Sequence, residues 1–561
     1  MANRYAVGVD YGSLSARALL LNLDTGEEAA VSEFVYPHAV MDTALPDGTP
    51  LGTDWALQHP QDYLDALHHT LPDLLHKAGA SPDEVVGIGI DFTSCTILPT
   101  TKEGTPLCFL PEYTGEPHAY VKLWKHHAAQ YCADLLNETA EQRGEPWLSL
   151  YGGRISSEWV VPKAMQIAKE APAVYDAAGR ILEAGDWVVW QLCGEEVRSA
   201  CNAGYKALWH HQNGYPSEAF FEALDPRMKH FVRDKLAAPD GTDRNIRPLG
   251  SRAGFLTREA AALTGLNEGT AVAVEIIDAH ASVPGSGINV AGQMLMIMGT
   301  STCHMLLSET EEGVPGTCGI VKDGILPGFY GYEAGQSCVG DHFAWFVENG
   351  VPAAYRDEAK ERGMNIHALL REKAGQLKPG ESGLVALDWW NGVRSVLMDF
   401  DLSGLIVGMT LQTKPEEIYR ALIEATAFGT RRIIEAFEDK GVPVRELYAA
   451  GGIALKDPMM MQIYADVCNR EIRLSGSTQS GALGSAIFGA AAAGPELSGF
   501  TDVGEAVRKL GRLHETVYRP VPAHVDAYER LYGEYRRLHD FFGLEEGTMK
   551  RLKQMKKEAK G

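Results

Sequence analysis

The amino-terminal segment alternates short apolar runs with turn residues. Residues 5–10 and 17–23 are apolar runs separated by Gly12-Ser13, and the hairpin signal Asp24-Thr25-Gly26 leads into a third run at residues 27–35. Runs of this length between turn residues predict three consecutive strands.

A helical pattern begins at Pro60, a favourable first helical position. Its apolar residues recur at spacings of three and four: Leu64, Leu67, Leu71, Leu74 and Leu75. Pro72 lies inside this stripe, so we expect a kink there or a second short helix. Residues 85–90 are then apolar and end at Asp91, which predicts a buried strand.

The middle of the chain, residues 119–270, carries weaker patterns, with helical spacing at 120–137 and 157–170 and an apolar segment at 186–192. The second half restarts like the first, because the apolar run 293–298 leads into Gly299-Thr300-Ser301-Thr302. Two strands that each end in a glycine–hydroxyl turn indicate an internal duplication.

The clearest helix runs from Pro415 to about Lys440. Thr413-Lys414-Pro415-Glu416 fits a capping box, and Gly441 ends the pattern. A strand at 447–450 then leads into Gly451-Gly452, and Asp457-Pro458 begins another helix. Apolar residues at 525–542 predict a last long helix, and the lysine-rich residues 550–560 are expected to form a solvated tail.

Composition narrows the possible functions. The 561 residues are 45% hydrophobic and 22% charged, as in ordinary globular proteins, and the net charge is −23. This excess of acidic groups disfavours nucleic-acid and anionic-membrane partners. We find neither a signal-peptide pattern nor an apolar stretch near ~20 residues. The nine cysteines form no Cys-x-x-Cys pair, which favours reduced thiols and a cytoplasmic protein.

The two common nucleotide fingerprints are absent. The chain has no Gly-Lys dipeptide, hence no Walker-type loop, and no G-x-G-x-x-G. Three glycine turns directly follow strands instead, at Gly12-Ser13, Gly299-Thr300 and Gly451-Gly452. Any one of them is typical of an ordinary strand end, but three together favour phosphate binding through backbone amides. Asp10, just before the first turn, could hold Mg²⁺ directly or through water.

These motifs resemble the FGGY carbohydrate kinases of the actin-like ATPase superfamily. That family's long signature is matched over 21 residues. The match begins with Gly404-Leu-Ile-Val-Gly408-Met and, after seven further residues, ends with Glu417-Ile418-Tyr-Arg-Ala421-Leu-Ile-Glu424. The turn Asp10-Tyr-Gly12-Ser13-Leu-Ser15-Ala-Arg17 resembles its phosphate turn, and Gly451-Gly452-Ile-Ala-Leu-Lys456 resembles its adenosine turn. The resemblance covers about residues 4–495.

Within the family, the ribulokinase branch is the most similar. Three stretches are typical of it: Tyr151-Gly-Gly-Arg-Ile-Ser-Ser-Glu158-Trp159, Cys201-Asn-Ala-Gly-Tyr-Lys206-Ala-Leu-Trp209 and Gly331-Tyr-Glu333-Ala-Gly-Gln-Ser337. Gly299-Thr-Ser-Thr-Cys303 is similar as well. Two departures stand out. Trp124-Lys125-His126-His127-Ala128 replaces the Trp-Asn-Asp-x-Arg of xylulose kinases, and Lys456 stands where glycerol kinases have asparagine.

The resemblance implies a role for each matching residue. The catalytic base falls on Asp278, in Ile277-Asp278-Ala-His280-Ala, although the pattern alone would be typical of a loop or helix-capping aspartate. The implied sugar contacts are Cys95, Lys206, Asp278 and Glu333. The implied nucleotide contacts are Gly12, Ser13, Ser15, Arg17, Gly299, Thr300, Gly451, Gly452 and Lys456, with Asp10 at the metal. We interpret His126, His127 and His280 as structural.

We therefore expect an α/β fold of two actin-like (ribonuclease H-like) domains flanking a catalytic cleft. A sugar-binding domain would span residues 1–286, and a nucleotide-binding domain with the carboxyl-terminal helices would span 287–561.

The implied activity is ATP- and Mg²⁺-dependent phosphorylation of ribulose at its 5-hydroxyl in L-arabinose catabolism. L-ribulose is the first candidate, with D-ribulose left open. The expected partners are a ketopentose, ATP and a second copy in a homodimer. The alternatives are another family kinase, acting on xylulose, glycerol or another polyol, and a non-catalytic actin-like ATP-binding protein.

Overall fold

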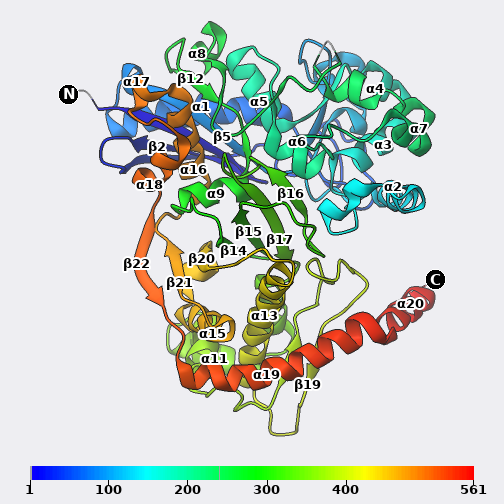
Figure 1. The fold of residues 1–561 in the computed structure, drawn as a ribbon, viewed down its shortest axis with the longest axis vertical. Helices are drawn as coiled ribbons and strands as arrows, with labels where there is room; N and C mark the ends of the chain where they lie inside the picture. Colours follow the sequence, from blue (N-terminus) through cyan, green and yellow to red (C-terminus); the bar gives the residue numbers. More distant parts are fainter. Residues whose placement is uncertain (1–2, 239–240, 561) are drawn as a thin grey trace.

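The computed structural model describes residues 3–238 and 241–560. Residues 1–2, 239–240 and 561 lie outside these ranges, and with them the predicted start of the first domain at residue 1 and the predicted end of the second at residue 561. The chain forms two α/β halves, each built on a seven-stranded sheet. Figure 1 shows the amino-terminal half above the carboxyl-terminal half.

The first sheet has the order β11-β12-β5-β1-β2-β3, with β13 also paired to β5. β1, β2 and β3 form an antiparallel meander. β5 runs parallel to β1, and β12 runs parallel to β5. The strands are β1 (Tyr5–Tyr11), β2 (Ser15–Asn22), β3 (Glu28–Val35), β5 (Val85–Phe92), β11 (Arg252–Phe255), β12 (Ala271–Ala273) and β13 (Ile276–Ile277).

The second sheet repeats this arrangement in the order β16-β17-β15-β14-β20-β21-β22. β14, β15 and β17 form the meander, and β20 and β21 add in parallel. The same order in both halves agrees with the internal duplication predicted from the two similar turns. The strands are β14 (Gln293–Met298), β15 (Thr302–Ser308), β16 (Gly319–Lys322), β17 (Tyr330–Gln336), β20 (Glu446–Ala450), β21 (Ile472–Ser475) and β22 (Leu513–Tyr518).

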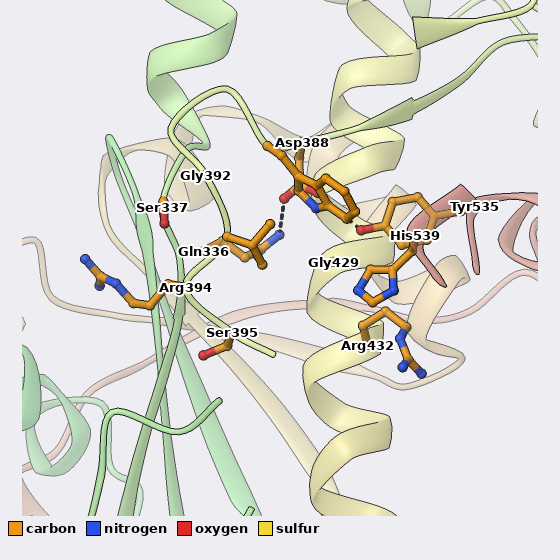
Figure 2. Close-up of a pocket in the computed structure, with 12 residues that line it drawn as sticks. Gln336, Ser337, Asp388, Gly392, Arg394, Ser395, Gly429, Arg432, Tyr535 and His539 are labelled. Carbon is orange, nitrogen blue, oxygen red and sulfur yellow. Dashed lines mark hydrogen bonds between the residues drawn. The ribbon is translucent and has the colours of Figure 1, made fainter. Parts of the chain in front are cut away.

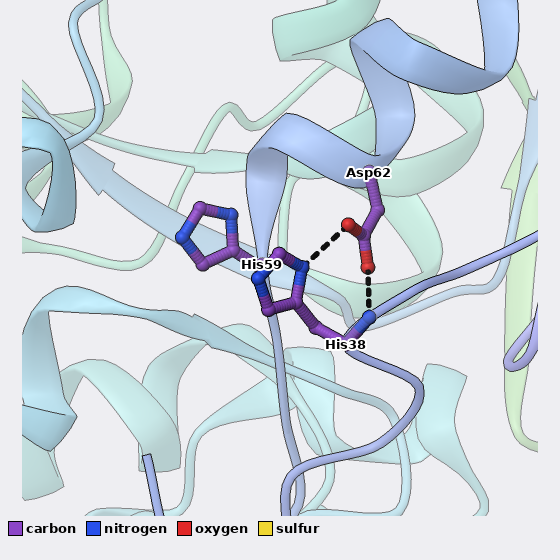
Figure 3. Close-up of side chains that lie close together, drawn as sticks. All are labelled: His38, His59 and Asp62. Carbon is purple, nitrogen blue, oxygen red and sulfur yellow. Dashed lines mark hydrogen bonds and ion pairs between the residues drawn. The ribbon is translucent and has the colours of Figure 1, made fainter. Parts of the chain in front are cut away.

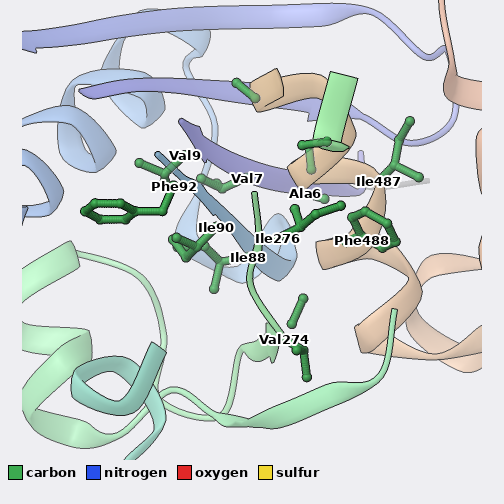
Figure 4. Packing of buried hydrophobic residues seen from close by; sticks show 14 of the residues in the cluster. Ala6, Val7, Val9, Ile88, Ile90, Phe92, Val274, Ile276, Ile487 and Phe488 are labelled. Atoms are coloured by element: carbon green, nitrogen blue, oxygen red, sulfur yellow. The ribbon is translucent and has the colours of Figure 1, made fainter. Parts of the chain in front are cut away.

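Helix α16 (Ser480–Ala493) comes from the carboxyl-terminal half of the sequence but packs on the first sheet, against β1 and β5. Three glycines of β1 and β5, Gly8, Gly87 and Gly89, make this approach possible. A Cβ at Gly8 would lie 1.8 Å from the Ala482 carbonyl oxygen, and a Cβ at Gly89 would lie 2.0 Å from that of Ser485. Ile487 and Phe488 of α16 join the core of the first sheet (Figure 4).

The opposite face of the first sheet is covered by α1 (Pro60–Ala78), where the Tyr11 hydroxyl donates to the Tyr63 carbonyl at 3.0 Å. A four-stranded sheet, ordered β4-β7-β6-β8, forms the outer part of this half. Its strands are β4 (Leu57–Gln58), β6 (Ile97–Thr100), β7 (Val121–Lys122) and β8 (Arg180–Glu183). Two further strand pairs are β9 (Arg198–Ser199) with β10 (Ile246–Arg247), and β18 (Val385–Leu387) with β19 (Leu405–Val407).

The remaining α-helices are α2 (Gln130–Arg143), α3 (Val160–Glu170), α4 (Pro172–Ala177), α5 (Ala184–Cys193), α6 (Ala200–Lys206), α7 (Glu218–Leu224), α8 (Arg258–Thr264), α9 (Asp278–Gly285), α10 (Gly340–Asn349), α11 (Ala353–Glu361), α12 (Ile366–Ala374), α13 (Pro415–Glu438), α14 (Gly452–Lys456), α15 (Pro458–Cys468), α17 (Pro495–Ser498), α18 (Val503–Leu510), α19 (Pro522–Asp540) and α20 (Thr548–Lys560).

Most element predictions are confirmed, including the first strands, α13 and α19. α1 continues through Pro72 as one helix, so of the two outcomes expected there the second short helix does not form, and the kink stays a prediction. Two predictions were wrong. Residues 120–129 are not helical, and α2 begins only at Gln130. The lysine-rich end is helix α20 rather than a tail, and its Lys553 forms an ion pair with Asp401 at 3.2 Å.

The cap of α13 also differs in detail from the prediction. Lys414, not Thr413, is the N-cap, and its backbone N–H donates to the Glu417 carboxylate at 2.6 Å. The predicted start of the next helix is confirmed, because the Asp457 carboxylate accepts from the Met460 N–H at 3.0 Å. All nine cysteines are free thiols. Across residues 3–238 and 241–560, no helix has the length and apolarity needed to cross a bilayer.

Candidate active site

Three carboxyl groups meet where the strands of the first sheet end. Asp10 of β1 and Asp91 of β5 are paired in register, so their side chains lie on the same face. Asp278 follows β13, which pairs with the end of β5, and is the first residue of α9. The first turn of α16 lies against this group, since a Cβ at Gly481 would lie 3.4 Å from Asp91 Oδ1, and in the next turn the Ser485 hydroxyl donates to Asp91 at 2.6 Å.

The Asp10–Asp91 pair has the properties of a cation site. Burial raises the pKa of both carboxyl groups, and the neighbouring charge of Asp10 raises that of Asp91 further. One Asp91 oxygen is buried without a hydrogen-bond partner in the described part of the chain. Two adjacent carboxyl groups share a proton unless a cation neutralises them, and oxygen ligands suit Mg²⁺. These residues therefore fit the metal predicted at Asp10.

Asp278 is held at the start of α9 by its own helix, because its carboxylate accepts from the Ala279 backbone N–H at 2.7 Å. Burial, followed by the charge of Asp10, raises its pKa to about 7. A carboxyl group with this pKa can accept a proton near neutral pH. This position fits the predicted general base.

Lys206 and Glu333, the predicted sugar contacts, form a buried ion pair between the two halves. Lys206 Nζ of α6 donates to Glu333 Oε2 of β17 at 2.8 Å. Although burial opposes both charges, the partner charge raises the pKa of Lys206 and lowers that of Glu333. His280 Nε2 also lies 3.5 Å from Glu333 Oε2, and Lys206 Nζ lies 5.4 Å from the Trp159 ring centroid.

Cys95 lies in the turn between β5 and β6, with a positive φ of 56°. Its carbonyl oxygen accepts from the buried Lys163 ammonium at 2.6 Å, which fixes the turn. Burial raises the pKa of its thiol to about 12, so Cys95 offers a neutral thiol and a fixed backbone to the site.

The first predicted phosphate turn is closed by a hydrogen bond from the Gly12 N–H to the Ser15 carbonyl at 3.0 Å. The Ser13 hydroxyl accepts from the Trp124 indole N–H at 2.9 Å. Ser15 and Arg17 both contact Glu33 of β3, at 2.9 and 3.3 Å. The structure therefore presents Gly12 and Ser13 at the turn and directs Ser15 and Arg17 toward the neighbouring strand.

The other two turns lie side by side, because β14 and β20 are parallel and Ile297 pairs with Ala450. Gly451 has φ 94°, and a Cβ there would lie 2.4 Å from the Met298 carbonyl oxygen, so only glycine fits. The Thr300 carbonyl accepts from the Val339 N–H at 2.9 Å. Lys456 is exposed at the end of α14.

A cavity of about 10 Å³ lies in the carboxyl-terminal half, between β17, α13 and α19. Its wall includes Gln336, Asp388 and Tyr535 (Figure 2). The Gln336 amide donates to Asp388 at 2.9 Å. This volume holds about one water molecule, so the cavity is too small for a nucleotide or a sugar.

Two histidine clusters lie apart from this site. His38 contacts Asp62 at 2.6 Å, and its ring stacks on that of His59 with 4.3 Å between centroids (Figure 3). Stacked rings direct their lone pairs side by side rather than toward one point, and His59 Nδ1 already accepts from the Gln61 N–H. In the second cluster, both ring nitrogens of His210 are engaged, one by Glu311 and the other by backbone N–H groups. We interpret both clusters as structural.

Asp91 and Ser485 are the residues that sequence reasoning missed. Asp91 was identified only as a strand end, although it ends its strand just as Asp10 does, and that similarity was the available signal. Ser485 had no comparable signal, because it lies 394 residues from Asp91 in the sequence.

Proteins named ribulokinase match nearly the whole chain. The one from Bacillus licheniformis is 58% identical over 544 residues, covering 97% of this chain and 98% of that protein. The one from Halalkalibacterium halodurans is 55% identical, covering 99% and 98%. The one from Mycolicibacterium smegmatis is 49% identical, covering 100% and 97%.

Solved structures share the fold at lower identity. A xylulose kinase from Rhodospirillum rubrum aligns with a TM-score of 0.78 at 23% identity, covering 96% of this chain and 98% of that chain. A Plasmodium falciparum glycerol kinase with ADP aligns with a TM-score of 0.73 at 16% identity, covering 96% and 98%. The expected fold of two actin-like domains is thereby confirmed.

The family models give the assignment. Residues 5–285 match the N-terminal domain of the FGGY family of carbohydrate kinases, and residues 294–493 match its C-terminal domain. The chain therefore belongs to the FGGY family of carbohydrate kinases.

Proposed function

We propose that this chain is a ribulokinase that transfers the γ-phosphoryl group of ATP to the 5-hydroxyl of ribulose. The observation that carries the proposal is its identity of 49–58% to full-length proteins of that name. The pairing of Lys206 with Glu333 beside Asp278 supports it, because these groups can donate to and accept from sugar hydroxyls.

In this proposal, Asp278 takes the proton of the 5-hydroxyl as that oxygen attacks phosphorus. A bond forms between O5 and the γ-phosphorus while the bond from that phosphorus to the bridging oxygen breaks, and the electrons leave with ADP. The raised pKa of Asp278 suits a base working near neutral pH. Lys206, Glu333 and the Cys95 turn would hold the other hydroxyls of the sugar.

Nucleotide binding is assigned to the three turns. The Gly12-Ser13 and Gly299-Thr300 turns would donate to phosphate oxygens, and the close approach at Gly451-Gly452 would admit the adenosine. Ser15 and Arg17 would support the first turn through Glu33, and Lys456 would reach the nucleotide from α14. Asp10 and Asp91 would hold Mg²⁺, which neutralises phosphate charge during transfer.

A coupled ADP assay with ribulose, xylulose, glycerol and other polyols tests the proposal. We expect the highest kcat/KM for a ribulose. A preference for xylulose or glycerol would place the chain in another branch of the family. ATP binding without transfer to any sugar would identify the non-catalytic alternative.

We also propose a cellular compartment and an oligomeric state for the enzyme. Nine free thiols suit a reducing cytoplasm, where ATP is available. The domain boundary near 286/287 and the homodimer remain predictions. Light scattering of the purified chain measures its molar mass in solution and so tests the homodimer.

A further inference from the structure

Arg394 lies beside the predicted sugar site without having been assigned a role. Its segment is hydrogen-bonded to the end of β17, because the Ser395 N–H donates to the Gly335 carbonyl at 3.0 Å. A Cβ on Gly335 would lie 3.3 Å from Arg394 Nη1, so the arginine side chain lies across this glycine. Gly335 and Glu333 are two residues apart in one strand and therefore share a face. The guanidinium thus lies on the face that presents Glu333.

Within residues 3–238 and 241–560 the Arg394 guanidinium makes no hydrogen bond or ion pair, although the side chain is half-buried. Figure 2 shows it directed away from Asp388, Tyr535 and His539. Arg432, which lines the same small cavity, is instead paired with Glu435 at 2.9 Å. A half-buried group with five N–H donors and no acceptor favours a ligand that accepts hydrogen bonds.

The surrounding charges indicate the kind of ligand. Although burial lowers the pKa of Arg394, Cys318, Glu158, Cys303 and Glu333 raise it above its usual range. Glu158 also raises the pKa of the Cys95 thiol, whereas the neighbouring charge with the largest effect on Asp278 is that of Asp10. Glu158 adjoins Trp159, whose ring centroid lies 5.4 Å from Lys206 Nζ, so Arg394 and Glu158 act on the side of the site that Lys206 and Glu333 form.

Charge balance points to a neutral ligand. Two cations, Lys206 and Arg394, lie among two carboxylates, Glu333 and Glu158. This arrangement suits an uncharged polyhydroxylated molecule better than a sugar acid, whose carboxylate would add a third negative charge.

We propose that Arg394 is a specificity-determining residue that donates hydrogen bonds to the C2 carbonyl of the bound ketopentose. This inference rests on the proposed function, which places the C5 hydroxyl at Asp278 and hence the C1–C2 end toward Arg394. A carbonyl oxygen only accepts, and a guanidinium only donates, so the two match. The corresponding pentitol has a hydroxyl there, which can also accept but only with its proton turned away from the guanidinium, and its sp³ carbon moves the oxygen out of the plane that the carbonyl occupies. Arg394 therefore favours the ketose over the alditol.

The test compares ribulose with ribitol in the full-length enzyme. We expect Arg394→Met to lower kcat/KM for ribulose about tenfold to a hundredfold, mainly through KM, as expected for a lost charged hydrogen bond. Ribitol should be affected much less, so the ratio of the two kcat/KM values should fall. Arg394→Lys keeps the positive charge and can still donate one hydrogen bond to the carbonyl. Its ratio of kcat/KM for ribulose to kcat/KM for ribitol should therefore lie between those of Arg394→Met and the wild type. Arg432→Met is the matched control and should leave the ratio unchanged.

Each outcome bears on the inference. An equal loss for ribulose and ribitol, or an unchanged ratio, would overturn it and identify Arg394 as a structural residue. If Arg394→Met does not fold, the Arg394→Lys ratio decides alone, and an unchanged ratio there overturns the inference. A wild-type enzyme active on ribulose separates this result from the proposed function. A wild type that phosphorylates no ketopentose would overturn both.

Discussion

Asp278 lies where burial and the charge of Asp10 oppose its ionisation, yet a general base must be ionised to work. The same position is close to Lys206, whose charge favours the ionised form. The balance leaves a base that is poised rather than permanently charged, and two predictions follow from that balance.

Asp278→Asn should remove most of the phosphoryl transfer while leaving both ligands bound. The two side chains have nearly the same size, but the amide cannot accept the proton, and general-base help is worth ~10²–10⁴ in rate. Single-turnover transfer with saturating ribulose and MgATP measures the loss, and calorimetry checks binding. Retention of more than about a tenth of the wild-type rate would exclude Asp278 as the essential base.

The pH dependence of kcat/KM should follow the ionisation of Asp278. Its pKa of about 7 means that the protonated, inactive form dominates at lower pH, so activity should rise as pH increases through about 7. The residual rate of Asp278→Asn provides the control, since it should lack this inflection. A wild-type profile already flat from pH 5 upward would contradict the assignment.

The sequence identified the acidic and basic residues of the site only through motif resemblance. Lys206 and Glu333 are separated by 127 residues, and no periodicity relates them. Asp91 and Arg394 were not identified because their roles depend on strand register and on a loop crossing Gly335. Such positions follow from the folded sheet, and short-range patterns carry no information about them.

At the scale of elements, periodic segments were predictable, and segments decided by tertiary contacts were not. α1 continues through Pro72, which lies on the exposed side of the helix together with His68, so the carbonyl that loses its partner faces solvent. Residues 121–122 form β7 and pair with β4, although their apolar spacing is equally compatible with a helix. Ion pairs with residues 399 and 401 place α20, and local sequence could not have indicated these contacts.

The glycine contacts of α16 give a stability prediction. Gly8→Val should strongly destabilise the fold, because the added Cβ would lie 1.8 Å from a backbone carbonyl oxygen that cannot move without displacing the helix. We expect a loss of at least ~3 kcal/mol, measured by urea unfolding. Gly533→Ala in α19 is the control, since its Cβ meets nothing within 4 Å and should stabilise by ~0.5–1 kcal/mol. Equal stability of Gly8→Val and the wild type would show that α16 does not dock as described.

At the scale of the molecule, the two halves are joined through both packing and charge. α16 crosses from the carboxyl-terminal half to the first sheet, and its end contacts the carboxyl pair at the site. Lys206 and Glu333 connect α6 to β17. The sequence predicted two similar halves, but it could not show that one half contributes a core helix to the other.

The last prediction concerns this ion pair between the halves. Lys206→Met leaves the Glu333 carboxylate buried without its partner, which should lower the free energy of unfolding by ~3–5 kcal/mol. The double variant Lys206→Met/Glu333→Gln removes the unpaired charge and should recover much of that stability. Ribulose binding should not recover, because the hydrogen-bonding groups toward the sugar are gone, and affinity should stay about tenfold to a hundredfold weaker.

Urea unfolding and calorimetry with ribulose and with MgATP separate these effects. Lys235→Met is the control, because Lys235 is also buried and donates to the Tyr175 carbonyl at 2.8 Å, away from the site. It should lower stability without changing the ratio of ribulose to ATP affinity. If the double variant instead binds ribulose like the wild type, or loses ATP affinity while keeping that for ribulose, the pair holds the two halves together without contacting the sugar.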